Sequence, residues 1–325
     1  MWARNIVCTC MNVSPGEQVL IYVDEPLAFV RDRLSGEVLE AGASGIWTYT
    51  IPDAVRPLTA YPPSLHQLIT QVDVVIGLQW DHFVLQESSA RMALAKSWRK
   101  GRARWGFGIC IDEDILANEL SADYHEIAAL TERLAQKMEG KERVHLTSPA
   151  GTELTLSIAG REVKRDTGLI HTPATYGNLP AGEVYMAPLE DSADGVLVVD
   201  KSFAGIVVRT PVRIAFQRGR AVSIEGGEEA EELRRQVEDA KGKEHGEWSE
   251  VIGELGIGTN PQARPLGNIM TDEKVKGTVH VALGNNYDHP IGGVNRAPIH
   301  IDGVVGEPTL VVDGEVLIEK GRYLV

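Results

Sequence analysis

A histidine and an aspartate stand two positions apart in the stretch NRAPIHIDGV, residues 295–304. In an extended strand, residues i and i+2 project from the same face, so the His300 imidazole and the Asp302 carboxylate would point at one spot. An isolated pair of this kind is more often just two polar residues on a partly exposed strand. A chemical role for the pair therefore depends on partners elsewhere in the chain.

The second half of the sequence supplies such partners on apolar or glycine-bordered segments. They are Glu183 in NLPAGEVYMAP, Glu254 in ELGIGTNP, and Glu273, His280 and Tyr287 in NIMTDEKVKGTVHVALGNNY. Each acid and the histidine also has an ordinary explanation. Glu183 could be a turn residue and Glu254 a helix end. Glu273 could be a solvated charge beside Lys274, and His280 a hydrogen-bonded strand histidine. Together with the first pair, however, they place four carboxylates and two histidines in one region.

Burying several carboxylates close together is costly, because like charges repel and desolvation disfavours their ionised forms. The arrangement becomes favourable when divalent cations neutralise it. Oxygen-rich ligands with one or two imidazoles suit Zn²⁺, Co²⁺, Mn²⁺ or Mg²⁺ rather than a thiolate site. Two such ions sharing a carboxylate would activate a water and polarise a carbonyl, as in two-metal hydrolases.

The predicted secondary structure that must position these residues differs between the two halves of the chain. The first half alternates apolar β-rich runs with helical patterns, which predicts an α/β domain with a mostly parallel open sheet over residues 1–140. It has neither a G-x-G-x-x-G motif nor a P-loop, so a nucleotide-binding role is unsupported. The strands are expected at residues 19–23, 46–51, 72–80 and 105–111, and the helices at 27–43, 88–101 and 123–140.

Beyond residue 140 short alternating strands are separated by turns such as SPAG, FQRGR and VDGE. This pattern predicts a β-rich (α+β) domain over residues 141–325, either barrel-like or sandwich-like. One helix is expected within it at residues 227–241, because its acidic start and basic end suit the helix dipole. The candidate metal ligands all fall in this second domain.

The 325-residue chain carries 46 acidic and 32 basic residues, for a formal net charge of −14. This charge argues against nucleic-acid and anionic-membrane partners, because both need a basic footprint. The three cysteines, sparse and odd in number, fit reduced thiols. The sequence has no signal-type segment and no apolar run long enough to span a bilayer. These features predict a soluble cytoplasmic protein.

Several motifs occur in a fixed order: NLPAGEVYMAP, GVLVVDKSFAG, VSIEGGEEAEEL, ELGIGTNPQARPLGNIMTDEKVKGTVHVALGNN and APIHIDGV. Together they resemble the aminopeptidase T/aminopeptidase S family of metallopeptidases, strongly over roughly residues 120–325. A weaker likeness continues through the first half in SPGEQVLIYVDEP and VDVVIGLQ. The resemblance implies a homodimer, a pair of divalent metal ions (Zn, Co, Mn or Mg) and a peptide or small amide substrate.

The resemblance also assigns roles to the candidate residues. Glu254 would bridge the two metals, Glu183 would be a ligand, and either acid would shuttle the proton. Tyr287 would stabilise the oxyanion of a tetrahedral intermediate. The remaining ligands would be Glu273, His280, His300 and Asp302.

The same fold occurs in 2,5-dihydroxypyridine dioxygenases, which hold one ferrous iron with two histidines and one carboxylate. In that branch the acid corresponding to Glu254 is a histidine and the PAGEV acid is lost, whereas this sequence keeps both acids. The resemblance therefore favours a metal-dependent hydrolase that removes N-terminal residues, although the first half is abbreviated relative to the family aminopeptidases. The alternatives are an Fe(II) ring-cleaving dioxygenase, a small-molecule amidohydrolase and a non-catalytic binding protein.

Overall fold

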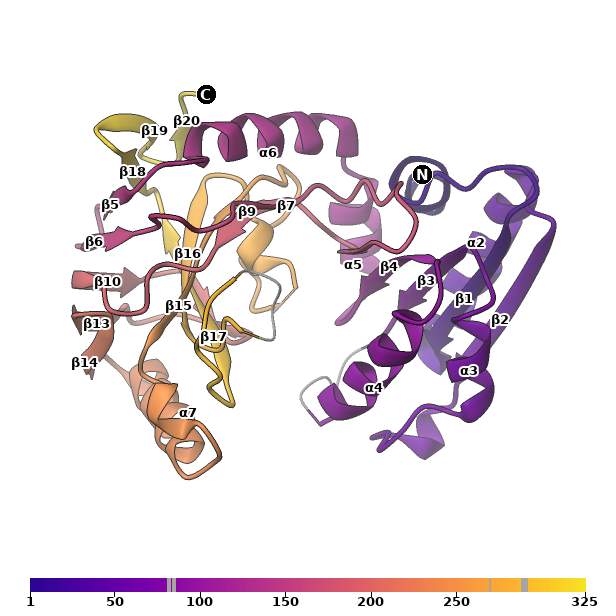
Figure 1. Ribbon diagram of the computed structural model, residues 1–325, viewed down its shortest axis with the longest axis horizontal. Helices are drawn as coiled ribbons and strands as arrows, with labels where there is room; N and C mark the ends of the chain where they lie inside the picture. Colours follow the sequence, from indigo (N-terminus) through magenta and orange to yellow (C-terminus); the bar gives the residue numbers. More distant parts are fainter. Residues whose placement is uncertain (81–82, 84–85, 269, 288–291) are drawn as a thin grey trace. The chain divides into compact units, whose positions relative to one another are not determined.

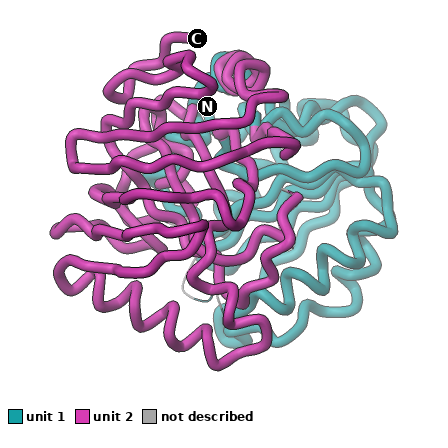
Figure 2. Tube along the Cα trace, turned by 60° about the vertical axis from the view of Figure 1, so that its left-hand side comes forward, with its two compact units in different colours: residues 1–128, 167–181 teal, residues 129–166, 182–325 magenta. Residues whose placement is uncertain are grey.

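The computed structural model describes residues 1–80, 83, 86–268, 270–287 and 292–325, and the chain forms two compact units (Figure 2). Unit 1 contains residues 1–128 and 167–181, and unit 2 contains residues 129–166 and 182–325. The chain thus enters unit 2, returns to unit 1 and leaves it again. The sequence-based division into residues 1–140 and 141–325 does not include this return.

Unit 1 is built on a five-stranded sheet with the order β2-β1-β3-β4-β8, and every pairing in it is parallel (Figure 1). The predicted α/β fold with a mostly parallel open sheet is confirmed. The strands are β1 (Gln18–Asp24), β2 (Gly45–Ile51), β3 (Val74–Leu78), β4 (Arg104–Gly108) and β8 (Tyr176–Asn178). The helices are α1 (Trp2–Arg4), α2 (Ala28–Glu40), α3 (Pro63–Leu68), α4 (Ser88–Trp98) and α5 (Glu113–Ala117).

The central strand β1 is buried on both faces, which explains its continuous apolar run. Val19 and Ile21 join one core cluster with residues of α2. Leu20 and Tyr22 join another cluster with residues of α3 and α4. Helices therefore cover the two faces of this sheet, as a parallel sheet requires.

Unit 2 contains two antiparallel sheets, of eight strands (β14-β13-β10-β6-β5-β18-β19-β20) and seven strands (β12-β11-β17-β16-β15-β9-β7). One hydrophobic core contains residues of both sheets, so of the two predicted forms the structure has the sandwich. The eight-stranded sheet comprises β5 (Arg143–Thr147), β6 (Glu153–Ser157), β10 (Asp194–Val199), β13 (Val212–Gln217), β14 (Arg220–Glu225), β18 (Thr309–Val312), β19 (Glu315–Glu319) and β20 (Arg322–Tyr323). The seven-stranded sheet comprises β7 (Lys164–Asp166), β9 (Glu183–Met186), β11 (Ser202–Phe203), β12 (Ile206–Val207), β15 (Ile252–Gly258), β16 (Thr278–Gly284) and β17 (His300–Gly306).

Two long amphipathic helices pack on the core of unit 2. Helix α6 (Tyr124–Met138) contributes Leu134 and Met138 to that core, and α7 (Glu228–Lys241) contributes Leu233 and Val237. Both helices were predicted from the sequence, α6 from its amphipathic pattern and α7 from its acidic start and basic end. Among the described residues, the structure has no helix of the length and apolarity that a membrane span requires.

Candidate metal centre

Four neighbouring strands of the seven-stranded sheet, β9, β15, β16 and β17 (Figure 1), carry five of the six predicted ligands. The sixth, Glu273, lies in the 3₁₀ helix Asp272–Lys274. Gly258 of β15 pairs with Glu183 of β9, and Ala282 of β16 lies between Glu254 and Asp302. Directly paired residues and residues two apart share a face of a sheet. The strand register therefore collects the carboxylates on one face.

The residues between the ligands face the opposite way, into the sandwich core. Leu255, Ile257, Val279, Val281 and Ile301 all belong to the hydrophobic cluster of unit 2. A slip of one residue in any of these pairings would turn the charged side chains into the apolar core of the sandwich and the apolar side chains out of it, so the hydrophobic core holds the ligand residues in register.

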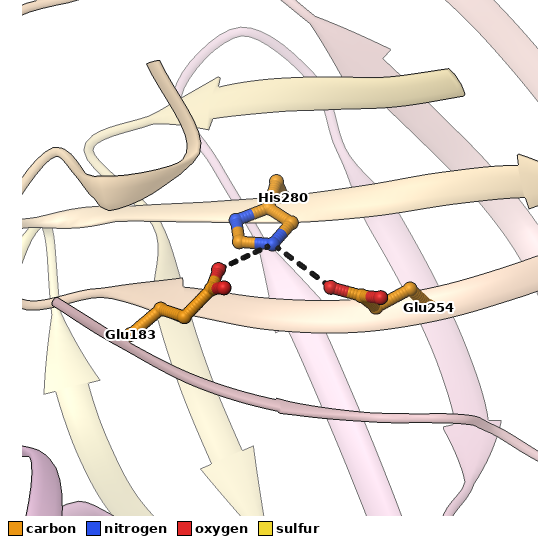
Figure 3. Close-up of side chains that lie close together, drawn as sticks. All are labelled: Glu183, Glu254 and His280. Carbon is orange, nitrogen blue, oxygen red and sulfur yellow. Dashed lines mark hydrogen bonds and ion pairs between the residues drawn. The ribbon is translucent and has the colours of Figure 1, made fainter. Parts of the chain in front are cut away.

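His280 lies at the centre of the set and is fully buried. Its Nε2 atom is 3.3 Å from Oε2 of Glu183 and 3.3 Å from Oε1 of Glu254 (Figure 3). The imidazole packs directly on the backbone of Gly256, where a Cβ atom would lie only 1.9 Å from Nε2. The glycine of the ELGIG segment therefore makes room for the histidine.

His300 and Asp302, the pair that first suggested chemistry, do point together. Nε2 of His300 is 3.3 Å from Oδ2 of Asp302 and 3.8 Å from Oε2 of Glu254. Nδ1 of His300 is 2.7 Å from the carbonyl oxygen of Asn285, so it donates there and directs Nε2 toward the carboxylates as the possible ligand atom. A backbone acceptor of this kind commonly orients a metal-binding histidine.

Three groups of donor atoms, each within 4.8 Å of one another, could hold a metal ion. They are Glu183, Glu254 and His280; Glu254, His300 and Asp302; and Glu273, His280 and Asp302. All six predicted metal ligands are thus brought together, and Glu254 belongs to two groups. Carboxylate oxygens with one imidazole per group suit a divalent cation such as Zn²⁺, Co²⁺ or Mn²⁺.

Two charged residues of this cluster were not among the predicted site residues. Lys274, in the short 3₁₀ helix Asp272–Lys274, is completely buried, and its Nζ atom lies 2.6 Å from Glu183 and 2.5 Å from Glu273. Asp166 of β7 lies 3.7 Å from the same Nζ atom and pairs with Glu183 in the strand register. Glu273 is therefore held by a buried ammonium, and is not a solvated charge.

The protonation equilibria of the carboxylates reflect crowding of negative charge. Burial raises the pKa of Glu254, and the charges of Asp302 and Glu183 add to the increase. Burial also raises the pKa of Glu273, to about 8, against the attraction of Lys274. Burial acts in the same direction on Glu183, but Lys274 and His280 together hold its pKa below the usual value.

The histidines respond in the opposite sense. Burial alone would lower the pKa of His300, but the charges of Asp302 and Glu254 outweigh it and raise the pKa to about 10. Glu183 and Glu254 raise the pKa of His280 well above its usual range in the same way. Without a metal ion, the carboxylates thus attract protons to both imidazoles. A divalent cation would supply that positive charge instead, so the donor set fits one.

Tyr287 is placed differently from the six ligands. Its side chain is 48% exposed, and the guanidinium carbon of Arg296 lies 3.7 Å from the centroid of its ring. Its backbone nitrogen donates to Asn285, whose carbonyl holds His300. Tyr287 is therefore tied to the same loop as the centre, while its role as an oxyanion donor stays a prediction.

Known proteins similar to this chain have two kinds of activity in their names. Aminopeptidase AmpS of Bacillus subtilis is 25% identical over 188 residues, which cover 50% of this chain and 43% of that protein. The 2,5-dihydroxypyridine 5,6-dioxygenase of Pseudomonas putida is 25% identical over 195 residues, covering 55% and 53%. Aminopeptidase T of Thermus thermophilus is 26% identical over 212 residues, covering 56% and 49%. The chain spans about half the length of these curated relatives.

Solved structures show the same fold over the full chain. The 2,5-dihydroxypyridine dioxygenase of Pseudomonas putida KT2440 aligns with a TM-score of 0.76 at 16% identity, covering 100% of this chain and 97% of that one. Wild-type AmpT of Thermus thermophilus aligns with a TM-score of 0.72 at 16% identity, covering 100% and 98%. The predicted resemblance to the aminopeptidase T/S proteins and the dioxygenases that share their fold is confirmed.

A family-level match covers the C-terminal part of unit 1 and all of unit 2. The sequence profile described as "NicX: 2,5-dihydroxypyridine 5,6-dioxygenase" matches residues 107–325, which include every predicted metal ligand. Since the match extends over more than half of the sequence, this chain belongs to the NicX family.

Proposed function

We propose that the protein is a metal-dependent hydrolase, and most specifically an aminopeptidase, whose two divalent cations share Glu254. The position of the Glu254 carboxylate supports this proposal. One oxygen faces His280 Nε2 at 3.3 Å, and the other faces His300 Nε2 at 3.8 Å. A carboxylate can bridge two cations with its two oxygens, whereas a neutral histidine offers one nitrogen to one metal.

The ligands would divide between two positions joined by Glu254: Glu183 and His280 on one side, His300 and Asp302 on the other, and Glu273 near His280 and Asp302. A bound pair of divalent cations polarises a carbonyl oxygen and lowers the pKa of a water. Glu183 or Glu254 would accept the proton of the attacking water and pass it to the leaving amine. The peptide substrate and the predicted homodimer are parts of the same proposal.

A ring-cleaving dioxygenase is the second candidate, because the matching family and one structural relative carry that description. Non-haem Fe(II) oxygenases use two histidines and one carboxylate around a single iron. Among the residues that the structure describes, none of the three donor groups contains both His280 and His300. This separation favours the hydrolase, as does the presence of both Glu183 and Glu254.

One pair of assays separates the two candidates. Release of free amino acids would be followed from unblocked dipeptides and aminoacyl amides, with cobalt, zinc or magnesium added. Oxygen uptake would be followed in parallel, with ferrous iron and hydroxylated pyridines. We expect amino acid release without oxygen uptake, and no cleavage of N-acetylated versions of the same peptides. Oxygen uptake without cleavage of any peptide or amide would contradict the hydrolase and establish the second candidate.

The variant Glu254→His tests the bridging role, because histidine cannot span two cations. We expect hydrolysis to fall by at least about 100-fold, the upper end of the loss seen when a residue that only orients a ligand is changed. The matched control is Glu229→His, which lies on α7 and belongs to none of the three donor groups. Comparable losses in both variants would show that a histidine substitution itself, and not the bridge, causes the effect.

A further inference from the structure

The ammonium group of Lys274 lies where a third cation of this cluster would be expected. Its Nζ atom is 2.6 Å from Oε1 of Glu183, 2.5 Å from Oε1 of Glu273 and 3.7 Å from Oδ2 of Asp166. The side chain is completely buried, so bulk solvent screens these contacts only weakly. Three carboxylates converging on one buried positive charge is the pattern that a metal ion also creates.

We propose that Lys274 is a built-in cation of the metal centre, a positioning residue that occupies a third cation position and leaves the divalent ions to the two groups sharing Glu254. The inference rests on the proposed metal centre. Lys274 holds Oε1 of Glu183, which directs Oε2, the oxygen that faces His280, toward a metal. Lys274 thereby makes Glu183 a one-oxygen ligand with a defined direction.

The charges of the cluster support this role. The carboxylates of Asp166, Glu183, Glu254, Glu273 and Asp302 would carry five negative charges when ionised. Lys274 and two divalent cations supply five positive charges, so with neutral histidines the cluster is balanced. A buried set of like charges is stable only when it is balanced in this way.

Lys274→Gln tests the proposal, because glutamine has a similar length and still donates hydrogen bonds but carries no charge. Without metal, the variant leaves one more buried negative charge uncompensated, so it should melt at a lower temperature than the wild type. With Mn²⁺ or Zn²⁺ the deficit should shrink, because the cations bind a more negative cluster more tightly. We expect the rise in melting temperature on adding metal to widen by at least about 3 °C, together with a lower Kd for Mn²⁺ in a calorimetric titration.

Lys241→Gln is the matched control, because Lys241 pairs with Glu250 and Glu238 on the surface of the same unit. It should leave the metal-induced rise unchanged. A lysine that only supports the fold predicts something different: Lys274→Gln would lower the melting temperature of the metal-free and metal-loaded proteins equally, with an unchanged or higher Kd for Mn²⁺. An equal fall in melting temperature with and without metal would overturn the proposal, and so would an unchanged or higher Kd for Mn²⁺.

If Lys274→Gln is not recovered in folded form, Asp166→Asn provides the same test with the opposite sign. It removes a negative charge beside Nζ, so the metal-induced rise in melting temperature should narrow, and an unchanged or wider rise would contradict the proposal. These measurements use no substrate. Absent peptidase activity with a normal Lys274 effect would refute only the proposed hydrolase, whereas absent binding of Mn²⁺ and Zn²⁺ to the wild type would refute both.

Discussion

Each unit of the protein buries a cluster of charged side chains, and the two clusters are organised differently. In unit 1, Arg56 contacts both Asp24 and Glu87. Oε1 of Glu87 accepts from Arg56 Nε at 2.5 Å and from the backbone of Leu58 at 2.6 Å, while Oε2 accepts from Arg56 Nη2 at 2.7 Å. Both oxygens of this carboxylate are therefore satisfied by donors of the protein itself.

In unit 2, the oxygens of Glu254 face His280 and His300, and other carboxylates lie close by. Lys274 serves Glu183 and Glu273 but does not contact Glu254 in the described structure. A carboxylate cluster with too few cationic donors of its own is organised to receive cations, whereas in the Arg56 cluster Glu87 already has donors of the protein on both oxygens. The comparison separates a structural ion-pair network from a candidate metal centre.

Arg56→Leu should produce the largest change in stability. Removing one partner of a buried ion pair leaves uncompensated charge and costs about 3–5 kcal/mol. The free energy of unfolding, measured with urea, should fall by that amount, while the number of metal ions bound per chain stays the same. Arg31→Leu, which breaks a surface pair with Asp32, should cost no more than about 1 kcal/mol. A change in the number of metal ions that Arg56→Leu binds would contradict the assignment of the Arg56 cluster to structure alone.

Removal of metal should have the next largest effect and should act through unit 2. Ions that bind only the native state stabilise it by about 3 kcal/mol at a hundredfold excess over Kd. Chelation should therefore lower the melting temperature of the wild type, and Asp302→Ala should abolish most of that response. Glu229→Ala, on α7 and outside the three donor groups, should respond to chelation like the wild type. Equal responses of the two variants would count against Asp302 as a ligand.

The smallest expected effect is a pH dependence that belongs to unit 1. Burial raises the pKa of Asp24 to about 6, although Arg56 opposes the shift. The folded-state pKa therefore lies above the unfolded value, so the contribution of Asp24 is fully present below about pH 4 and is lost as the pH rises through 6. In the wild type this lowers the free energy of unfolding by about 2 kcal/mol between pH 4 and pH 6, and in Asp24→Asn that decrease should be absent.

The measurement is the free energy of unfolding against pH for the wild type and Asp24→Asn, with and without metal. The difference between the two curves should not depend on metal, because Asp24 lies in unit 1. A difference that grows with pH in the opposite direction would show that Arg56 dominates over burial and that the pKa of Asp24 is lowered.

Local sequence patterns predicted much of the fold. The apolar runs at 19–23 and 72–80 became β1 and β3, and the amphipathic run at 123–140 became α6. Strand β8 was missed because its three residues, Tyr176–Asn178, gain their place only by pairing with β4. A pairing across such a sequence separation leaves no local signal, and neither does the return of the chain to unit 1 that brings it about.

The candidate metal centre could also be predicted only where it follows a local sequence pattern. His300 and Asp302 follow the two-residue period of a strand, so their common direction could be predicted. Lys274 lies in a polar stretch and is buried only because β9 and β7 bring Glu183 and Asp166 to it. Charged residues buried by partners distant in sequence cannot be distinguished from solvated ones by spacing alone.

Anomalous diffraction from crystals grown with Mn²⁺ or Zn²⁺ tests the central claim most directly. We predict two peaks per chain, about 3.5–4 Å apart, with one oxygen of Glu254 on each. Glu183 and His280 should contact one peak, and His300 and Asp302 the other. A single peak held by both histidines without Glu254 would contradict the shared-carboxylate centre and would favour the mononuclear oxygenase.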